Sequence, residues 1–506
     1  MIISFIKRIY NQKLEDLCVR LLYFFNTIDT YFIVAGITTF LICFFNIQGN
    51  PVILIAGLLL GIFTAKLADF YPAFVSLSFP ILITWGIFLK IPLDSLGVLL
   101  ILNILLFFII QFGLMGIPDS IVARDPKVAF IKMFNSLFTI APTTVSFTMS
   151  VFFSSYLAYC LYISSICKSK QDYVLYASGA ILLIIASLIT RLLRPINRFS
   201  KFHKPDTPSK PIFKRLLILN IDGVRKDVFD KLNLPTYSSL KGKGAWHEKG
   251  LETVYRALTN PAFASIFTGT IPTVHGVRDN NFGQSIQTEG LPDLVPTIAY
   301  GSMHVQHFCK KYWETRVVSL PEHSVYKSDD IMVDWLKDDL QNRPEIRLFV
   351  ADFSEADFLA HAYGSKSQAY KEALQRIDKR IGDVVSWLKE KKMDKDTGII
   401  ICSDHGIAAI DHSYLIAESE KYVPFLIYGP GVKKNLKITS PGKIMDICCT
   451  AAYLLGIPYP KDSRGQVFTE ALEKHDRARE TKKIVSRFNT LSYDAQASKY
   501  NSQRTE

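Results

Sequence analysis

The stretch "RLLILNID", residues 215–222, decides the fold. It is almost entirely apolar, shows no alternation of apolar and polar residues, and ends at the carboxylate Asp222. An uninterrupted apolar run of this length predicts a strand that is covered on both faces, as in the parallel sheets of α/β proteins. Three later runs have the same character: "IRLFVADF" (346–353), "TGIIICS" (397–403) and "VPFLIYG" (423–429).

Amphipathic stretches separate these strands. "SQAYKEALQRIDKRIGDVVSWLKEK" (367–391) and "GKIMDICCTAAYLLG" (442–456) carry apolar residues at helical spacing. Strands that alternate with helices predict an α/β/α sandwich with a mostly parallel sheet, here over residues 216–470. Residues 471–506 are charged and weakly patterned, which predicts a fraying tail.

The N-terminal part has a different composition. Six apolar runs approach the length that a bilayer requires, at 31–47, 52–68, 72–91, 96–117, 136–167 and 173–190. They predict a helical transmembrane domain over 31–190, with five or six spans because Pro142 interrupts the fifth run. Residues 1–30 contain Lys7 and Arg8 near the start and no cleavage site, so we expect an amphipathic helix on the membrane or a short disordered head.

The net charge of +12 could suggest nucleic acid as a partner. Residues 216–470 are almost neutral, however, and the linker 191–215 carries eight Lys or Arg against one Asp. A basic segment beside a membrane predicts contact with anionic lipid headgroups. We therefore expect no nucleic acid partner, and the oligomeric state stays open.

The eight cysteines show neither metal-knuckle nor disulfide spacing.

The side of the membrane that holds residues 216–506 also stays open. With six spans and a cytoplasmic N-terminus, the cations of 1–30, 116–133 and 191–215 all lie inside, which places the C-terminal domain in the cytoplasm. Five spans reverse this orientation.

Polar residues collect where the predicted strands end, the usual place for function in such sheets. Asp222 ends the first strand, and Asp404 and His405 end the third. Asp357 and His361 are spaced i and i+4, which places a carboxylate and an imidazole on one helical face at metal-binding distance. Taken singly, these pairs also fit ordinary surface turns and helices.

The segment "RALTNPAFASIFTGTIPTVHGVRDNN" (256–281) adds a hydroxyl. Pro261 predicts the first position of a short helix that Gly269 ends. Thr259 is then expected just ahead of the helix, where free N–H groups and the helix dipole favour an anion. A capping threonine explains the position as well. A threonine hydroxyl needs a metal or a base to act as a nucleophile, and two Zn²⁺-like ions provide both activation and charge stabilisation.

Four ordered motifs, "LNIDGVRKD", "TNPAFASIFTGTIPTVHGVRDN", "DFSEADFLAHAYG" and "SDHG", resemble the type I phosphodiesterase/nucleotide pyrophosphatase branch of the alkaline phosphatase superfamily. The resemblance covers most of 215–470 and implies an alkaline-phosphatase-like fold with two divalent ions, Zn²⁺ first and Mn²⁺ second. It implies one metal held by Asp222, Asp404, His405 and the nucleophile Thr259. The second is held by Asp357, His361 and a third imidazole.

Two features depart from the family pattern. Ala262 replaces the usual Asn, and the C-terminal segment "KDSRGQVF" lacks the usual histidine. His412, within "DHGIAAIDH", fits the spacing of related membrane transferases, so we assign it to the second metal; His475 lies in the charged tail. Asn280 matches the family amide that donates to a phosphoryl oxygen.

The resemblance thus implies a membrane-anchored phosphodiesterase that acts through a phospho-threonine intermediate on a lipid-linked or membrane-proximal phosphodiester. A transferase of phosphoethanolamine or glycerol-phosphate to a lipid or glycan is the alternative, and an inactive membrane scaffold is a third reading. Thr259 argues against a sulfatase, which needs Cys or Ser there. The family favours an extracytoplasmic catalytic domain.

Overall fold

The computed structural model describes residues 93–109, 113, 127, 130–131, 204–278, 280, 284–410, 412, 415 and 417–473. The N-terminal segment 1–30, the predicted spans other than part of 96–117, and most of the tail lie outside them. Helix α6 (Leu93–Phe108) is 16 residues long and apolar. None of the described helices has both the length and the apolar character needed to cross a membrane.

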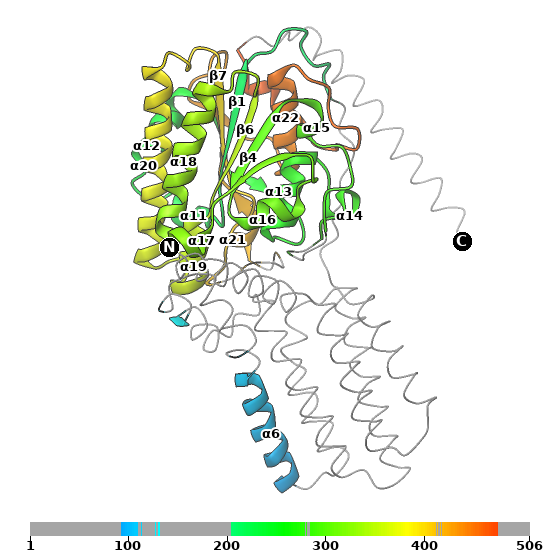
Figure 1. Ribbon diagram of the computed structural model, residues 1–506, viewed down its shortest axis with the longest axis vertical. Helices are drawn as coiled ribbons and strands as arrows, with labels where there is room; N and C mark the ends of the chain where they lie inside the picture. Colours follow the sequence, from blue (N-terminus) through cyan, green and yellow to red (C-terminus); the bar gives the residue numbers. More distant parts are fainter. Residues whose placement is uncertain are drawn as a thin grey trace, which may run out of the picture.

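An eight-stranded sheet forms the centre of the described C-terminal domain (Figure 1). Five adjacent strands, β7, β1, β6, β4 and the edge strand β5, are parallel, and β9 runs antiparallel to both of its neighbours, β7 and β2. This confirms the prediction of a mostly parallel sheet. The strand order is β10 (Leu436–Ile438), β2 (Ala245–His247), β9 (Phe425–Tyr428), β7 (Thr397–Cys402), β1 (Arg215–Ile221), β6 (Leu348–Phe353), β4 (Thr297–Gly301) and β5 (Glu314–Val317). A separate pair joins β3 (Leu251–Glu252) to β8 (Tyr422–Val423).

Helices cover both faces of this sheet, which confirms the three-layer α/β/α architecture. One face packs against α13 (Thr259–Thr268), α15 (Leu291–Leu294), α16 (Met303–Phe308) and α22 (Met445–Leu455). The other packs against α11 (Lys226–Phe229), α12 (Pro235–Lys243), α18 (Val325–Asn342), α19 (Glu355–Tyr363) and α20 (Gln368–Glu390). Shorter elements are α14 (Pro272–His275), α17 (Leu320–His323), α21 (Glu418–Lys421) and the 3₁₀ turn η2 (Thr469–Ala471).

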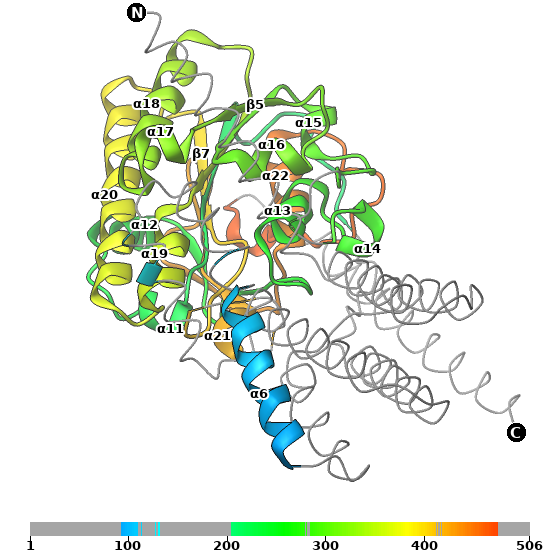
Figure 2. The same cartoon turned by 60° about the horizontal axis from the view of Figure 1, so that its bottom comes forward.

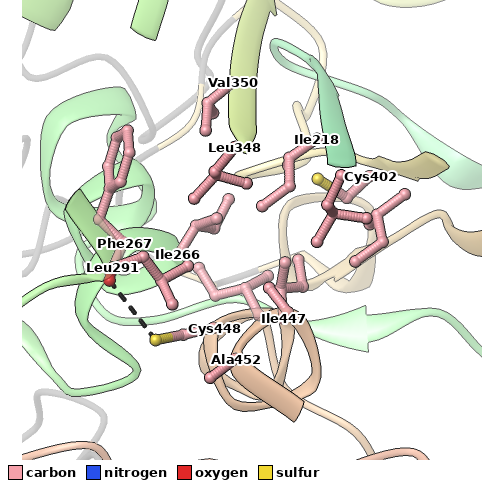
Figure 3. Packing of buried hydrophobic residues seen from close by; sticks show 14 of the residues in the cluster. Ile218, Ile266, Phe267, Leu291, Leu348, Val350, Cys402, Ile447, Cys448 and Ala452 are labelled. Carbon is pink, nitrogen blue, oxygen red and sulfur yellow. Dashed lines mark hydrogen bonds between the residues drawn. The ribbon is translucent and has the colours of Figure 1, made fainter. Parts of the chain in front are cut away.

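The two cores follow from the alternation of side chains along β1. Leu216 and Ile218 point into the core with α13 and α22, while Leu217 and Leu219 point into the core with α18 and α20. All four are fully buried. Figure 3 shows the first core, where α13 and α22 meet the sheet and the Cys448 thiol of α22 donates to the carbonyl of Phe267 at 3.4 Å. An uninterrupted apolar strand is thus needed because both of its faces are covered.

The end of the basic linker packs on this domain. The Lys204 amine donates to the Ser463 carbonyl at 2.7 Å, and the Tyr459 hydroxyl donates to the Pro205 carbonyl at 2.6 Å. Phe213 is fully buried, so tightly that a Cβ on Gly398 would lie 2.1 Å from its ring. Residues 204–214 are therefore packed on the domain up to the start of β1.

A buried ion cluster fixes α19 against α18 and α20. Glu355 at the start of α19 is fully buried and bonds to the guanidinium of Arg380, which also bonds to Asp330 at 2.6 Å. Asp329 accepts hydrogen bonds from the Ser354 and Glu355 N–H groups. Burial raises the pKa of Asp329 to about 8, although Arg380 opposes the rise. The cluster sets the position of the helix that carries Asp357 and His361.

Replacing Arg380 with Ala should therefore destabilise the protein by about 3–5 kcal/mol, because buried Asp329 loses its cation and buried Glu355 keeps only Arg376. Denaturant unfolding of the purified protein measures this loss. Arg343→Ala is the matched control: this arginine also bonds two carboxylates, Glu314 and Glu345, but on the surface. Its loss should cost about 1 kcal/mol or less. An equal loss of unfolding free energy in the two variants would contradict the stabilising role of the buried ion cluster.

Candidate active site

The candidate site lies at the C-terminal ends of β1 and β7 and at the first turn of α13. Helix α13 begins at Thr259, with Leu258 as N-cap, and ends at Gly269 with φ of 66°. The predicted end is confirmed, but the predicted start was wrong: Thr259 is the first residue of the helix and Pro261 the third. Proline is tolerated there because the first-turn N–H groups have no intrahelical acceptor to lose.

The first cluster surrounds the Nε2 atom of His405. It lies 3.2 Å from Thr259 Oγ1, 3.2 Å from Asp222 Oδ1 and 3.4 Å from Asp404 Oδ2. All four residues are buried. The predicted first set, Asp222, Thr259, Asp404 and His405, is thus brought together around one point, although these residues come from three separate parts of the chain.

The second cluster surrounds Asp357. His361 Nε2 lies 3.2 Å from Asp357 Oδ2, and His412 Nε2 lies 3.7 Å from Asp357 Oδ1. The two Nε2 atoms are 3.2 Å apart. The i, i+4 pair therefore shares one helical face, as the spacing predicts, and His412 reaches it from the loop after β7.

Each imidazole is oriented by a backbone carbonyl. The Nδ1 atoms of His361 and His405 lie 2.7 and 3.1 Å from the carbonyl oxygens of Ile410 and Gly406, and that of His412 contacts the carbonyl of Ala257. Burial lowers the pKa of His405 and of His412, so both rings are neutral and Nδ1 carries the proton. Their Nε2 lone pairs then point into the site, an arrangement typical of metal-binding histidines.

Some carboxylate oxygens of the site have no hydrogen-bond donor among the described residues. Asp222 Oδ1 and Asp357 Oδ1 are buried and receive no hydrogen bond from the residues that the structure describes. Burial, and then repulsion by neighbouring carboxylates, raises the pKa of Asp222 and of Asp404. Burial also opposes ionisation of Asp357, but His361, His412 and His405 together outweigh it and hold the pKa of Asp357 below its usual value. Divalent cations would offset this concentration of negative charge.

The donor atoms fit two metal positions. Asp222, Asp404 and His405 form one group whose ligand atoms lie within 4.8 Å of one another, and Asp357, His405 and His412 form another. His405 belongs to both groups, and its ring stacks on that of His412 with centroids 3.8 Å apart. Buried Asp and His in such groups suit Zn²⁺, with oxygen-rich sites also accepting Mn²⁺. The shared histidine was not expected from the sequence.

Asn280 lies beside the start of α13. Its Oδ1 atom accepts the Asn260 N–H at 3.0 Å, which leaves the NH₂ group as the donating part of the amide. His275 is fully buried and contacts Ser265 Oγ at 3.0 Å, while burial lowers the pKa of His275 to about 3. His275 therefore stays neutral and serves packing.

Gly223 is a site residue that sequence reasoning missed. It has φ of 67°, and a Cβ there would lie 2.4 Å from Asp357 Oδ1. Only glycine permits this close approach of β1 to the second cluster. Its position directly after Asp222 was the available signal.

Gly223→Ala should displace Asp357 and reduce the bound metal, which elemental analysis of the purified protein measures. The matched control is Gly431→Ala, because Gly431 has a similar φ of 76° but its nearest neighbour would lie 3.8 Å from the new Cβ. Both variants carry backbone strain of about 1 kcal/mol or more. Equal metal content in the two variants would contradict the crowding argument.

Several known proteins are similar to this chain. The family model "Type I phosphodiesterase / nucleotide pyrophosphatase" matches residues 216–290 and 295–499. An uncharacterized pyrophosphatase/phosphodiesterase of Schizosaccharomyces pombe is 24% identical over 227 residues, covering 40% of this chain and 46% of the relative. The human ectonucleotide pyrophosphatase/phosphodiesterase family member 1 is 26% identical over 268 residues, covering 47% of this chain and 27% of the relative.

Another relative is a human transferase. The catalytic subunit of GPI ethanolamine phosphate transferase 2 is 24% identical over 278 residues, covering 52% of this chain and 28% of the relative. The chain spans less than half the length of these curated relatives. Murine ectonucleotide pyrophosphatase/phosphodiesterase 5 has a TM-score of 0.42 at 13% identity, over 49% of this chain and 96% of that chain.

The family model covers the ends of β1, β6 and β7 together with α13, and with them every residue of the two clusters. It also covers more than half of the whole chain. The chain therefore belongs to the type I phosphodiesterase/nucleotide pyrophosphatase family of the alkaline phosphatase superfamily.

Proposed function

We propose that this protein is a membrane-anchored, metal-dependent phosphodiesterase in which Thr259 is the nucleophile. The observation that carries the proposal is the convergence of Asp222, Asp404 and His405 on the Thr259 hydroxyl, with Asp357, His361 and His412 beside them. A phosphodiester needs an activated oxygen and positive charge at its leaving oxygen, and this cluster fits both requirements.

Two divalent ions, when bound, would supply the positive charge that activates the threonine hydroxyl and stabilises the leaving oxygen. Asp222, Asp404 and His405 would hold the first ion beside Thr259. Asp357 and His412 would hold the second together with His361, whose Nε2 lies 3.2 Å from Asp357 Oδ2, and His405 lies at the boundary between the two positions.

Thr259 and the start of α13 position the reacting group. Thr259 Oγ1 attacks phosphorus in line, so that a phospho-threonine forms as the bond to the leaving oxygen breaks. The first turn of α13 directs the positive end of the helix dipole towards the phosphoryl oxygens. Its Asn260 N–H is bonded to Asn280 Oδ1, so the helix start and Asn280 form one unit beside the reacting group. The Asn280 NH₂ group donates to one of these oxygens. Attack by water then returns the free threonine.

The substrate that we propose is a phosphodiester on a lipid or close to a membrane. In both views α6 extends away from the edge of the domain where α11, α19 and α21 lie (Figures 1 and 2). Val98, Ile101, Ile104, Leu105 and Phe108 on this helix are each at least 46% exposed. Such an apolar surface suits lipid, and α19 carries Asp357 and His361, so a membrane-bound substrate would reach this edge of the domain.

A transferase is the second candidate. The similarity to the GPI ethanolamine phosphate transferase 2 catalytic subunit extends over 52% of this chain and favours transfer of a phosphorylated headgroup to an alcohol acceptor. Both reactions share the phospho-threonine step and differ only in whether water or an alcohol takes the group. An inactive scaffold is disfavoured, because such a domain has no need to keep six metal-ligand side chains together.

Thr259→Ala should reduce turnover of bis-p-nitrophenyl phosphate to background, because no other hydroxyl occupies its position. Thr259→Ser should retain part of the activity and form a phospho-serine that mass spectrometry detects. Asn280→Ala should lower kcat by roughly 10²–10³-fold, the usual cost of losing one donor to transition-state charge. Wild-type rates in Thr259→Ala would rule out this nucleophile.

Removal of divalent ions with a chelator should abolish turnover, and Zn²⁺ or Mn²⁺ should restore it. The pKa of Asp222 and of Asp404 is raised without cations, so these carboxylates take up protons in the stripped protein. Reloading should therefore become weaker as the pH falls, because metal and protons compete for the same oxygens. Full activity in the stripped protein would contradict the metal-dependent reaction.

A vesicle assay separates hydrolase from transferase. Vesicles that contain phosphatidylethanolamine or phosphatidylglycerol with labelled headgroups are incubated with the protein, and products are identified by mass. A hydrolase releases free phosphoethanolamine or glycerol phosphate, whereas a transferase leaves the label on an added glycan or lipid acceptor. Turnover of soluble diesters alone, with every lipid intact, would contradict the lipid substrate.

A further inference from the structure

The turn that follows β1 carries two features of the site. Asp222 begins the turn, and Gly223 comes next, with a positive φ and its backbone close to Asp357. Both residues of the turn are buried, as is Val224. The Val224 N–H donates to the His405 carbonyl at 3.0 Å. One side of the turn is therefore tied to the segment that carries His405.

The other side of the turn is held by one hydroxyl. Tyr370 Oη donates to the Gly223 carbonyl at 3.0 Å and accepts the Arg225 N–H at 2.8 Å. A single side chain thus bonds the backbone groups on both sides of Val224. Buried backbone groups are costly to leave without a partner. The Tyr370 hydroxyl therefore fixes the path of the chain directly after Asp222.

Tyr370 comes from a distant part of the sequence. It lies in the first turn of α20, where its own N–H donates to Oγ of the N-cap residue Ser367 at 3.2 Å. Helix α20 follows α19, which carries Asp357 and His361, and it lies beside α11 and α19 (Figures 1 and 2). The hydroxyl thus joins the turn that carries Asp222 to the corner between α19 and α20.

Ser365 joins a third segment to this corner. It is fully buried, its N–H donates to the Ala409 carbonyl at 2.6 Å, and its Oγ accepts from Arg225 Nη1 at 3.4 Å. Ala409 belongs to the loop that runs from His405 to His412. The three chain segments that supply the Asp and His ligands of the two candidate metal positions therefore meet at the corner between α19 and α20.

Packing accounts for the ring of Tyr370 but not for its hydroxyl. The ring lies in the core with Leu374 and Ile377, where a phenylalanine would fill the same space. The side chain is fully buried, and both of its hydrogen bonds go to the backbone of the turn after β1. The hydroxyl therefore serves the conformation of that turn.

We propose that Tyr370 is a positioning residue whose hydroxyl holds the turn after β1 in its metal-binding conformation before a cation is bound. The inference rests on the proposed function, which supplies the cation. Ligands that are already in place bind metal more tightly, because the cost of ordering them does not reduce the binding free energy. Loss of a partner behind a metal ligand weakens metal binding by roughly 10–100-fold. Tyr370 acts through the backbone, so we expect roughly tenfold, the lower end of that range.

The test is the affinity of the metal-stripped, full-length protein for Zn²⁺, measured by competition with a chromogenic chelator. Tyr370→Phe keeps the ring in the core and removes only the hydroxyl. It should weaken Zn²⁺ binding by roughly tenfold, because the turn that carries Asp222 must then be ordered when the metal binds.

Tyr300→Phe is the matched control. Tyr300 on β4 is also fully buried in this core, but its hydroxyl donates at 2.7 Å to Asp339 on α18, a helix that carries no candidate ligand. Its loss should lower the thermal midpoint of the stripped protein and leave Zn²⁺ affinity unchanged. A merely structural role of Tyr370 predicts the same pattern for Tyr370→Phe.

Hydrogen exchange adds a measurement that needs no variant. In the stripped wild-type protein, the peptide that spans 222–228 should exchange slowly at Val224 and Arg225, because His405 and Tyr370 hold these N–H groups without metal. Exchange there at the rate of an unfolded chain would overturn the inference, even if Tyr370→Phe did not fold.

The outcomes separate this inference from the function on which it rests. A wild-type protein that binds no Zn²⁺ contradicts the proposed function. A wild-type protein that binds Zn²⁺ with the same affinity as Tyr370→Phe overturns the positioning role alone. An equal loss of affinity in Tyr370→Phe and Tyr300→Phe also overturns it, because general destabilisation would then explain both.

Discussion

Mutual repulsion among buried carboxylates is the constraint on which this site depends. Asp222, Asp357 and Asp404 are all buried at one edge of the sheet. Ionised carboxylates in a poorly solvated place are costly unless cations compensate them. The protein surrounds them with imidazoles whose backbone bonds direct Nε2 inward. Such a site would lower its free energy by binding divalent ions.

The rest of the fold stabilises the protein enough to hold these charges close together. Parallel strands β1, β6 and β7 deliver their carboxylates to one edge, while two separate apolar cores secure the sheet on both faces. The Arg380 cluster fixes α19, and Gly223, with its positive φ, lets Asp357 approach the site closely. These stabilising contacts lie away from the first turn of α13, where the proposed substrate binds.

Local patterns in the sequence were enough for much of this arrangement. The strand ends located Asp222 and Asp404, and the i, i+4 spacing placed Asp357 and His361 on one face. The start of α13 was misplaced, because a proline fits any position of the first turn and does not mark the first residue. The sharing of His405 between the two groups depends on how α19 and the loop after β7 approach each other, which no local pattern contains.

The contacts of buried Asp352 with Asn220 and His304 were not predicted from the sequence, for a related reason. Within "LFVADF" the acid appears as one polar residue at the end of a buried strand, and its partners lie on β1 and α16, far away in the chain. Long-range partners of this kind become visible only in three dimensions. The membrane spans predicted from the six apolar runs stay predictions, since nearly all of them lie outside the described residues.

The number of metal ions bound to the purified full-length protein tests the central claim most directly. Elemental analysis after removal of loosely bound ions should find two divalent ions per chain, and loss of Asp404 together with His405 should remove most of both. A wild-type protein that retains no divalent ion after exposure to Zn²⁺ or Mn²⁺ would show that the buried carboxylates are neutralised in another way and would contradict this account.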